Sequence, residues 1–249
     1  MPLRENGCAA RFARHLGSYE GAATVQHFMA DRVVNELAAL RPGRRFGRVL
    51  DLGCGTGLLS RRFGREFAWD ELYLYDRVPG CGAYCRDLPR SSFHQLDLDA
   101  ADSFPEAECV LSGACCQWLK DPERLFCAVA AALKRGGVFA GSAFTEGNFP
   151  ELKSCGGAPV EFPQKEVWRE MLEKAGLRLF RFAAEPVTLC FPSAAAALRH
   201  LRETGVLTPA FGTPGAARRF LRRYEEYGGV PGRVPLTYMP VYWTGVKMR

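Results

Sequence analysis

Residues 49–57 read Val-Leu-Asp-Leu-Gly-Cys-Gly-Thr-Gly, and this segment constrains the fold more than any other part of the chain. A short apolar strand runs into an acidic residue and three alternating glycines, and residues 58–67 then have a helical pattern. Glycine lets the backbone turn tightly and approach a ligand, and the free amides that begin a helix face that ligand. The segment therefore predicts a strand–turn–helix unit that binds a nucleotide-like cofactor.

The spacing of the glycines separates two classes of cofactor. Dinucleotide sites have the pattern G-x-G-x-x-G, whereas Gly53, Gly55 and Gly57 alternate, with Cys54 inside the turn. Asp51 precedes the first glycine, where a carboxylate would repel a pyrophosphate but would suit the cationic amino-acid end of S-adenosylmethionine. We therefore expect S-adenosylmethionine as the cofactor, and an NAD-dependent oxidoreductase is the less favoured alternative.

Acidic residues also end the next two expected strands. Asp76 follows the second strand, where a carboxylate can accept both ribose hydroxyls. Asp97 follows the third strand, where it can accept from the adenine amino group, and Asp99 and Asp102 are alternatives for that role. Because the carboxyl ends of parallel strands meet at one edge of a sheet, we expect these acids around one cofactor.

Strands and helices alternate through the middle of the chain. The first expected strand ends at Asp51, and the next five cover 72–75, 93–96, 109–112, 138–144 and 177–182. The expected helices cover 21–40, 58–67, 122–133 and 167–174. This alternation predicts a parallel sheet with helices on both faces. The last third departs from the pattern, with two further helices expected at 193–203 and 216–227 and a long last strand at 236–246.

The cofactor turn and the acids after it resemble the seven-stranded class I methyltransferases. The resemblance implies an α/β, Rossmann-like fold with a mostly parallel sheet, an antiparallel last strand, N-terminal helices and a helical lid between strands six and seven. We expect one methyltransferase domain over residues 1–249. Its expected parts are an N-terminal helical cap (1–45), a cofactor-binding core (46–190), the lid (191–233) and the final strand (234–249).

Segments outside the cofactor turn resemble the malonyl-[acyl-carrier protein] O-methyltransferases of biotin synthesis, and the likeness spans nearly the whole chain. The matching residues are Ser18-Tyr19, Gln26, Gln117-Trp118, the Gly-x-x-Pro-Glu-Leu run at 147–152, Leu198-Arg199-x-Leu201, Thr204-Gly205 and Pro235-Leu236-Thr237-Tyr238. The chain departs from that family at 77–85, which is rich in Gly and Pro where a regular helix is expected. The resemblance implies methyl transfer to the free carboxylate of a malonyl thioester on acyl carrier protein, with malonyl-coenzyme A as a further possible substrate.

The resemblance also gives candidate residues for this chemistry. A carboxylate is already ionised at pH 7, so no general base is required. Arg199 is the first candidate to bind the substrate carboxylate because its planar fork suits that group, and Arg202 is the alternative. Tyr19 follows Gly17-Ser18, which we expect to be flexible, and could close over the cofactor. The other candidates are Tyr238 for the substrate, and Gln117 and Trp118 for the methyl pocket, with Gln117 on the cofactor side.

Charge and composition bear on the partner. Four arginines recur at helical spacing and predict one basic face for docking the acidic carrier protein, although a solvated charged face has the same pattern; they are Arg218, Arg219, Arg222 and Arg223. The net charge of +6 fits an acidic partner.

The ten cysteines form no paired C-x-x-C motif, and no apolar run is long enough to span a membrane. We therefore expect a cytoplasmic monomer without metal, nucleic-acid or membrane partners.

Two other functions are consistent with the same cofactor motif. One is methylation of another small-molecule carboxylate or hydroxyl, because the cofactor turn does not identify the acceptor. The other is a non-catalytic methyltransferase-like subunit that binds a partner, which the intact Asp51 and glycines disfavour.

Overall fold

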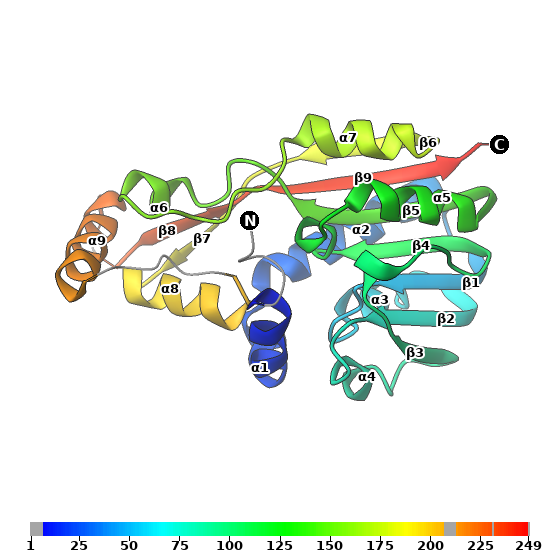
Figure 1. The fold of residues 1–249 in the computed structure, drawn as a ribbon, viewed down its shortest axis with the longest axis horizontal. Coiled ribbons are helices and arrows are strands. Elements are labelled where there is room, and N and C mark those ends of the chain that lie inside the picture. The colour runs from blue at the N-terminus through cyan, green and yellow to red at the C-terminus, as the bar shows by residue number, and fades with distance from the viewer. Residues whose placement is uncertain (1–6, 207–212, 231, 249) are drawn as a thin grey trace.

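The computed structural model describes residues 7–206, 213–230 and 232–248, and its main feature is a seven-stranded sheet (Figure 1). The strand order is β3-β2-β1-β4-β5-β9-β6, and β9 is antiparallel to both of its neighbours. The other six strands are parallel, which confirms the expected Rossmann-like class. The strands are β1 (Arg45–Leu52), β2 (Ala68–Asp76), β3 (Ser91–Gln95), β4 (Ala107–Gly113), β5 (Leu133–Phe144), β6 (Leu177–Ala184) and β9 (Pro240–Lys247).

Helices pack on both faces of this sheet because the central strands are apolar on both sides. Along β4, Cys109 and Leu111 join one core and Val110 joins the other, as the two-residue period of a strand requires. The first core is covered by α2 (Thr24–Leu40) and α3 (Leu58–Phe63), and the second by α5 (Pro122–Ala132) and α7 (Lys165–Lys174). Four short helical segments complete the core: α4 (Cys81–Tyr84), α6 (Pro150–Ser154), η1 (Leu98–Ala100) and η2 (Cys116–Trp118).

The N-terminal region differs from the sequence expectation. The expected helix at 21–40 begins at Thr24, and a separate helix, α1 (Gly7–Ala22), precedes it. Gly17 and Ser18, expected to be flexible, lie inside α1. Tertiary packing stabilises this additional helix, because Leu16 of α1 packs with Val78 and Cys81 in a small apolar cluster.

An insertion between β6 and β9 projects from one end of the sheet (Figure 1). It contains β7 (Val187–Phe191), α8 (Ala194–Glu203), α9 (Pro214–Tyr227) and β8 (Val234–Tyr238). Both helices were expected, and side chains cap both: Ser193 Oγ and Thr213 Oγ1 each accept a backbone amide at 3.1 Å. The antiparallel β7–β8 ribbon was not expected, because five-residue strands of this kind are stabilised by pairing with a distant partner.

The expected single strand at 236–246 is two strands. β8 pairs with β7 in the insertion, and β9 joins the main sheet after a break at Met239. The loop that follows β5 occupies the break: Thr145 donates its amide to the Met239 carbonyl at 2.9 Å, and Asn148 Oδ1 accepts the Met239 amide at 3.0 Å. The chain therefore changes sheets where another loop takes over its backbone hydrogen bonds.

Candidate active site

A cavity opens at the carboxyl ends of β1, β2 and β4, the edge at which ligands bind in open α/β sheets. Its floor includes the glycine turn between β1 and α3, and its sides come from α1, α2 and the end of α8. Of the residues predicted from sequence, nine contribute to its wall: Tyr19, Asp51, Gly53, Cys54, Gly55, Asp76, Asp97, Gln117 and Trp118.

The glycine turn has a backbone that other residues would strain. Gly53 has a φ of 74°, and a Cβ built on it would lie 2.1 Å from the sulfur of Cys115, so both conformation and space require glycine. The amides of Gly53 and Cys54 both donate to the Tyr75 carbonyl, at 2.8 and 3.0 Å, which fixes the turn to the end of β2. Gly57 caps α3 with a φ of 84° and lies outside the cavity wall, so it shapes the turn from behind.

Asp51 is fully buried at the end of β1. Ser60 donates a hydrogen bond of 2.6 Å to its Oδ2, and its Oδ1 has no hydrogen-bond partner among the described residues. Burial raises the pKa of this carboxyl to about 7, the Ser60 hydrogen bond opposes that rise, and the nearby Asp76 adds to it. An unpaired acidic oxygen in a cavity wall is suited to a cationic ligand group.

Asp76 is buried at the end of β2 and already holds the turn in place. Its Oδ2 accepts the Gly55 amide at 3.0 Å, and its Oδ1 accepts the Val78 amide at 2.9 Å. Burial raises the pKa of Asp76, and these two backbone hydrogen bonds oppose the rise. Each oxygen keeps a further lone pair, so the carboxylate can orient the glycine turn and still accept a ligand hydroxyl.

The structure distinguishes the three acids considered for the adenine side. Asp97 lines the cavity, while its Oδ1 accepts the Asp99 amide at 3.1 Å and its Oδ2 lies 3.5 Å from the Arg77 guanidinium. Asp99 instead accepts the Lys120 amide, and Asp102 pairs with Arg124 at 2.6 Å on the surface. Neither Asp99 nor Asp102 belongs to the cavity wall.

Two buried amide side chains add further hydrogen-bond acceptors to this wall. The Oε1 atoms of Gln26 and Gln117 are buried without a hydrogen-bond partner among the described residues, while Gln117 Nε2 donates to the Ala114 carbonyl at 2.7 Å. With Asp51 Oδ1, these make three carboxylate or amide oxygens of the wall without a partner among the described residues, and the hydroxyl oxygens of Thr56 and Ser142 in the same wall are unpaired as well. A buried polar group left unsatisfied costs about 1–3 kcal/mol, so a ligand carrying several donors would recover that cost. In the sequence, Gln26 is only one of the residues that match the family, and no role was predicted for it.

The remainder of the wall is largely apolar. Tyr19 and Phe12 of α1 meet edge to face at 4.8 Å, and Trp118 meets Phe162 in the same way at 5.5 Å. Val206 and Thr204, which follow α8, close the cavity on the side of the insertion. This part of the site can hold an uncharged portion of a substrate and exclude water.

Three predicted substrate residues lie outside this wall. Arg199 and Arg202 are exposed on α8, because the helix turns Ala197 and Leu201 toward the core. Tyr238 is fully buried in β8 behind the cavity, where its ring meets that of Phe149 at 4.8 Å. Burial raises the pKa of Tyr238, and Thr204 faces its hydroxyl and opposes that rise, without a hydrogen bond of good geometry.

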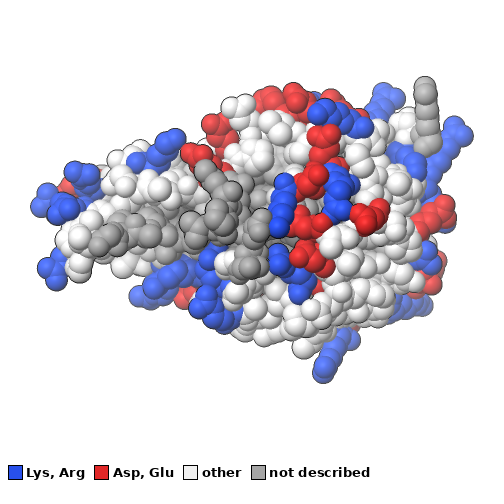
Figure 2. Space-filling view, viewed as in Figure 1, with Lys and Arg blue, Asp and Glu red and all other residues white. Residues whose placement is uncertain are grey.

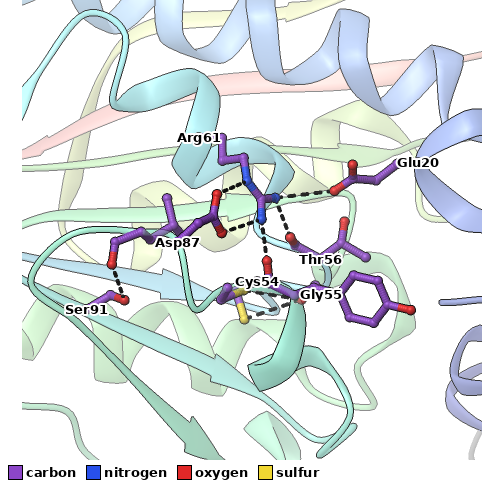
Figure 3. Close-up of polar contacts among 10 residues, drawn as sticks. Glu20, Cys54, Gly55, Thr56, Arg61, Asp87 and Ser91 are labelled. Carbon is purple, nitrogen blue, oxygen red and sulfur yellow. Dashed lines mark hydrogen bonds and ion pairs between the residues drawn. The ribbon is translucent and has the colours of Figure 1, made fainter. Parts of the chain in front are cut away.

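Arg61 was missed by the sequence analysis, and it connects the glycine turn to two neighbouring segments (Figure 3). Its guanidinium donates to the Thr56 carbonyl at 2.6 Å, pairs with Asp87 at 2.8 Å and pairs with Glu20 of α1 at 3.3 Å. It also donates to the Tyr84 carbonyl. No sequence signal identifies this role, because the partners are brought together by the tertiary fold.

Glu151, in the run at 147–152, joins the loop after β5 to the insertion. Its buried carboxylate accepts the Thr237 hydroxyl at 2.5 Å and the Thr237 amide at 3.1 Å. This residue positions β8 and does not line the cavity.

The four arginines of α9 are exposed on the part of the insertion farthest from the sheet. Figure 2 shows Lys and Arg side chains gathered at the end of the molecule where Figure 1 places α9. Arg222 pairs with Glu226 at 3.4 Å across one helical turn, and both side chains are largely exposed. The opposite face of α9 buries Phe220 and Tyr224, and the Tyr224 hydroxyl donates to the Pro235 carbonyl at 2.7 Å.

Comparison with known proteins identifies the family. A family model for a methyltransferase domain matches residues 22–181. The malonyl-[acyl-carrier protein] O-methyltransferase of Chlorobium phaeovibrioides is 34% identical over 244 residues, covering 93% of this chain and 92% of the relative. The chain belongs to the malonyl-[acyl-carrier protein] O-methyltransferase family. A second family member, from Porphyromonas gingivalis, is 31% identical over 239 residues, covering 94% of this chain and 92% of the relative.

The fold agrees with this family. A solved structure of a putative methyltransferase from Bacillus halodurans superposes with a TM-score of 0.64 at 13% identity, covering 87% of this chain and 99% of that one. S-adenosylmethionine is accordingly the cofactor, as expected from the sequence, and the cavity fits it. The unpaired acceptors of Asp51, Gln26 and Gln117 in its wall suit a ligand that carries an ammonium group, and Gly53 lines the same wall without a side chain.

Two structural findings concern membranes and metal ions. None of the described helices has the length and apolarity needed to cross a bilayer. Within the same residues, no three His, Cys, Asp or Glu side chains are arranged to hold a metal ion.

Proposed function

We propose that this enzyme transfers the methyl group of S-adenosylmethionine to the free carboxylate of a malonyl thioester carried by acyl carrier protein, giving the malonyl methyl ester used for biotin synthesis. The observation that carries this proposal is the likeness over 93% of the chain to a malonyl-[acyl-carrier protein] O-methyltransferase. That likeness includes the insertion and the last strand as well as the cofactor core. The cytoplasm is the compartment in which we place the reaction.

Methyl transfer requires the protein chiefly to position two molecules. The cofactor supplies an electrophilic methyl group on a sulfonium, and the malonyl carboxylate is already a nucleophile at neutral pH. Asp51 and Gln117 would hold the amino-acid end of the cofactor, while Phe12 and Trp118 would keep water from the transfer site. Orientation and exclusion of water can supply about 7–11 kcal/mol of barrier reduction without a general base.

We assign recognition of the substrate carboxylate to Arg199, with Arg202 as the alternative. Both belong to α8, whose end at Thr204 forms part of the cavity wall. Because both side chains are exposed, contact with the carboxylate requires α8 to move or the malonyl group to bind at the rim. We assign Tyr19 in the wall to closing over the cofactor, and the hydroxyl of Tyr238 behind Thr204 to orienting the malonyl group.

We assign docking of the carrier protein to the arginine face of α9. Its four guanidinium groups are exposed, and three of them lack an ion pair among the described residues, so they are available to an acidic surface. Such complementarity raises association rates and is weakened by salt. Arg219→Glu/Arg223→Glu should raise KM for malonyl-acyl carrier protein about tenfold while KM for a small malonyl thioester stays unchanged.

A matched control is a double variant with the same change in charge at exposed positions of β5 and β6, Arg135→Glu/Arg181→Glu. It should leave both KM values near those of the wild type. Equal increases in KM for the two double variants, or an equal loss on the small thioester, would contradict docking at α9.

The reaction itself is tested by methyl transfer from labelled S-adenosylmethionine to malonyl-acyl carrier protein, with acetyl-acyl carrier protein as the control. We expect a base-labile methyl ester on the malonyl form alone. Binding of S-adenosylhomocysteine without transfer to any malonyl thioester would leave the cofactor site in place and refute the proposed acceptor. A panel of free acids would then identify another carboxylate.

A further inference from the structure

The cysteines are the sequence feature that methyl transfer leaves unused. The side chains of nine of the ten are described, and none of these nine forms a disulfide. Several gather around the glycine turn, although cofactor binding requires no thiol there. Cys54 belongs to the turn, and the others near it are Cys81, Cys85 and Cys115.

Cys54 and Cys85 share one acceptor. Each sulfur lies 3.8 Å from the carbonyl oxygen of Gly55, and the two thiols also contact each other. Cys54 lines the cofactor cavity, whereas Cys85 is buried at the end of α4, beneath the turn. Two residues separated by 31 positions in sequence are thus held with their thiols side by side.

Arg61 holds the two cysteine-bearing segments together (Figure 3). One guanidinium nitrogen donates to the carbonyl of Thr56, two residues after Cys54, and another donates to the carbonyl of Tyr84, immediately before Cys85. Asp87 fixes the same guanidinium from the far side at 2.8 Å. The proximity of the sulfurs therefore rests on several backbone contacts and not on side-chain rotamers alone.

We propose that Cys54 and Cys85 form a redox modification site, in which a disulfide between them in the cofactor-free enzyme abolishes cofactor binding. The oxidant is a small peroxide that enters through the cofactor cavity. Because the proposal concerns the cofactor site, it does not depend on which methyl acceptor the enzyme uses.

The oxidation balances with one hydrogen peroxide. The Cys54 thiolate attacks one peroxide oxygen, the O–O bond breaks, and the released hydroxide takes up the thiol proton to give water and a sulfenic acid. The Cys85 sulfur then attacks the Cys54 sulfur, the S–O bond breaks, and a second water leaves. The two thiols lose two electrons to the peroxide. Contact with Cys85 and burial both raise the pKa of Cys54, so the thiolate is scarce and oxidation should accelerate as pH rises.

The new bond would distort the turn that the cofactor needs. A disulfide brings the two sulfurs to about 2.05 Å, much closer than thiols in non-bonded contact. The backbone on either side of Cys54 is fixed to β2, because the Cys54 amide donates to the Tyr75 carbonyl and the Gly55 amide donates to Asp76. Pulling Cys54 toward Cys85 therefore strains these contacts and moves its side chain away from the cavity wall. Bound cofactor covers Cys54 and should block the reaction.

The test treats the cofactor-free full-length protein with hydrogen peroxide and measures S-adenosylhomocysteine binding by calorimetry and disulfides by non-reducing peptide mapping. We expect a Cys54–Cys85 cross-linked peptide, at least about tenfold weaker binding and full recovery with dithiothreitol. Prior addition of S-adenosylhomocysteine should prevent both changes.

Two variants separate this site from oxidation elsewhere. Cys85→Ser should bind S-adenosylhomocysteine and keep that binding after peroxide, whereas Cys127→Ser, which removes an exposed thiol of α5, should stay as sensitive as the wild type. Three results would each overturn the proposal. They are a loss of binding without the cross-link, a cross-link without a loss of binding, and the absence of the cross-link under conditions that oxidise Cys127. If Cys85→Ser does not fold, the wild-type peptide map and its reversal by dithiothreitol decide the matter. Ligand binding needs no acceptor, so this result is independent of the malonyl assay.

Discussion

The ionisation of Asp51 should make cofactor binding depend on pH near neutrality. Asp51 is fully buried, and burial raises the pKa of its carboxyl to about 7 in the cofactor-free protein. Asp76 adds to the rise, while the hydrogen bond from Ser60 opposes it. The ammonium group of the cofactor forms an ion pair with the ionised Asp51 carboxylate but not with its protonated form. Cofactor binding and deprotonation of Asp51 are therefore coupled.

The size of the effect follows from that pKa. A group with a pKa of about 7 is roughly 90% ionised at pH 8 and roughly 10% ionised at pH 6. The affinity for S-adenosylhomocysteine should therefore fall about tenfold between pH 8 and pH 6, which is about 1.4 kcal/mol. Binding at pH 6 should release close to one proton per site, because the ligand drives Asp51 to its ionised form.

Isothermal titration calorimetry at pH 6, 7 and 8, in buffers of different ionisation enthalpy, measures both quantities. Asp51→Asn is the control, because it keeps a side chain of the same shape and leaves only the ligand's own titration. Its binding should be weaker and less dependent on pH. The same pH dependence in both proteins, or no proton release by the wild type at pH 6, would refute the role given to Asp51.

Asp51 should also affect the stability of the cofactor-free enzyme. Its pKa is raised on folding, so the folded protein binds this proton more tightly than the unfolded chain between about pH 4 and pH 7. The contribution of Asp51 to stability therefore falls as pH rises through that window, by up to about 4 kcal/mol. Asp51→Asn should accordingly raise the free energy of unfolding at pH 8 and change it little at pH 4, as urea denaturation at the two pH values will show.

Three further substitutions test other parts of the site. Gly53→Ala should abolish S-adenosylhomocysteine binding, because its Cβ meets the Cys115 sulfur; wild-type affinity in calorimetry would contradict the geometry of the turn. Glu151→Ala removes the acceptor of the half-buried Thr237 amide, while the Thr237 hydroxyl keeps its contact with Thr188 Oγ1, and should cost about 1–3 kcal/mol in urea denaturation; a loss below about 0.5 kcal/mol would show that the pair is dispensable. Tyr238→Phe should leave stability within about 0.5 kcal/mol, since its hydroxyl has no well-formed hydrogen bond in the described structure. If Tyr238 orients the malonyl group, KM for that substrate should rise, and an unchanged KM would remove Tyr238 from the site.

Local sequence was sufficient for the cofactor half of the site. The residues at 49–57 encode the end of a strand, the turn and the cap of the helix that begins at Leu58, and Asp76 and Asp97 each follow a strand that its own residues predict. Once parallel strands are aligned, their carboxyl ends meet at one edge, so three acids far apart in sequence become neighbours without further information. Asp97 could not be separated from Asp99 by this reasoning, because both follow the same strand.

The substrate half was decided by packing between distant segments. The direction of Arg199 depends on which face of α8 is buried. That face is set by β7, which precedes α8 in the chain, and by β8 and α1, which are distant from it in sequence. The break at Met239 depends on a loop about 90 residues earlier, which supplies the hydrogen bonds that a continuous strand would have used. The contacts of Arg61 and the pairing of Cys54 with Cys85 arise in the same way. The chain therefore determined by local pattern where its cofactor binds, whereas the surroundings of the substrate were fixed by tertiary contacts that no local pattern encodes.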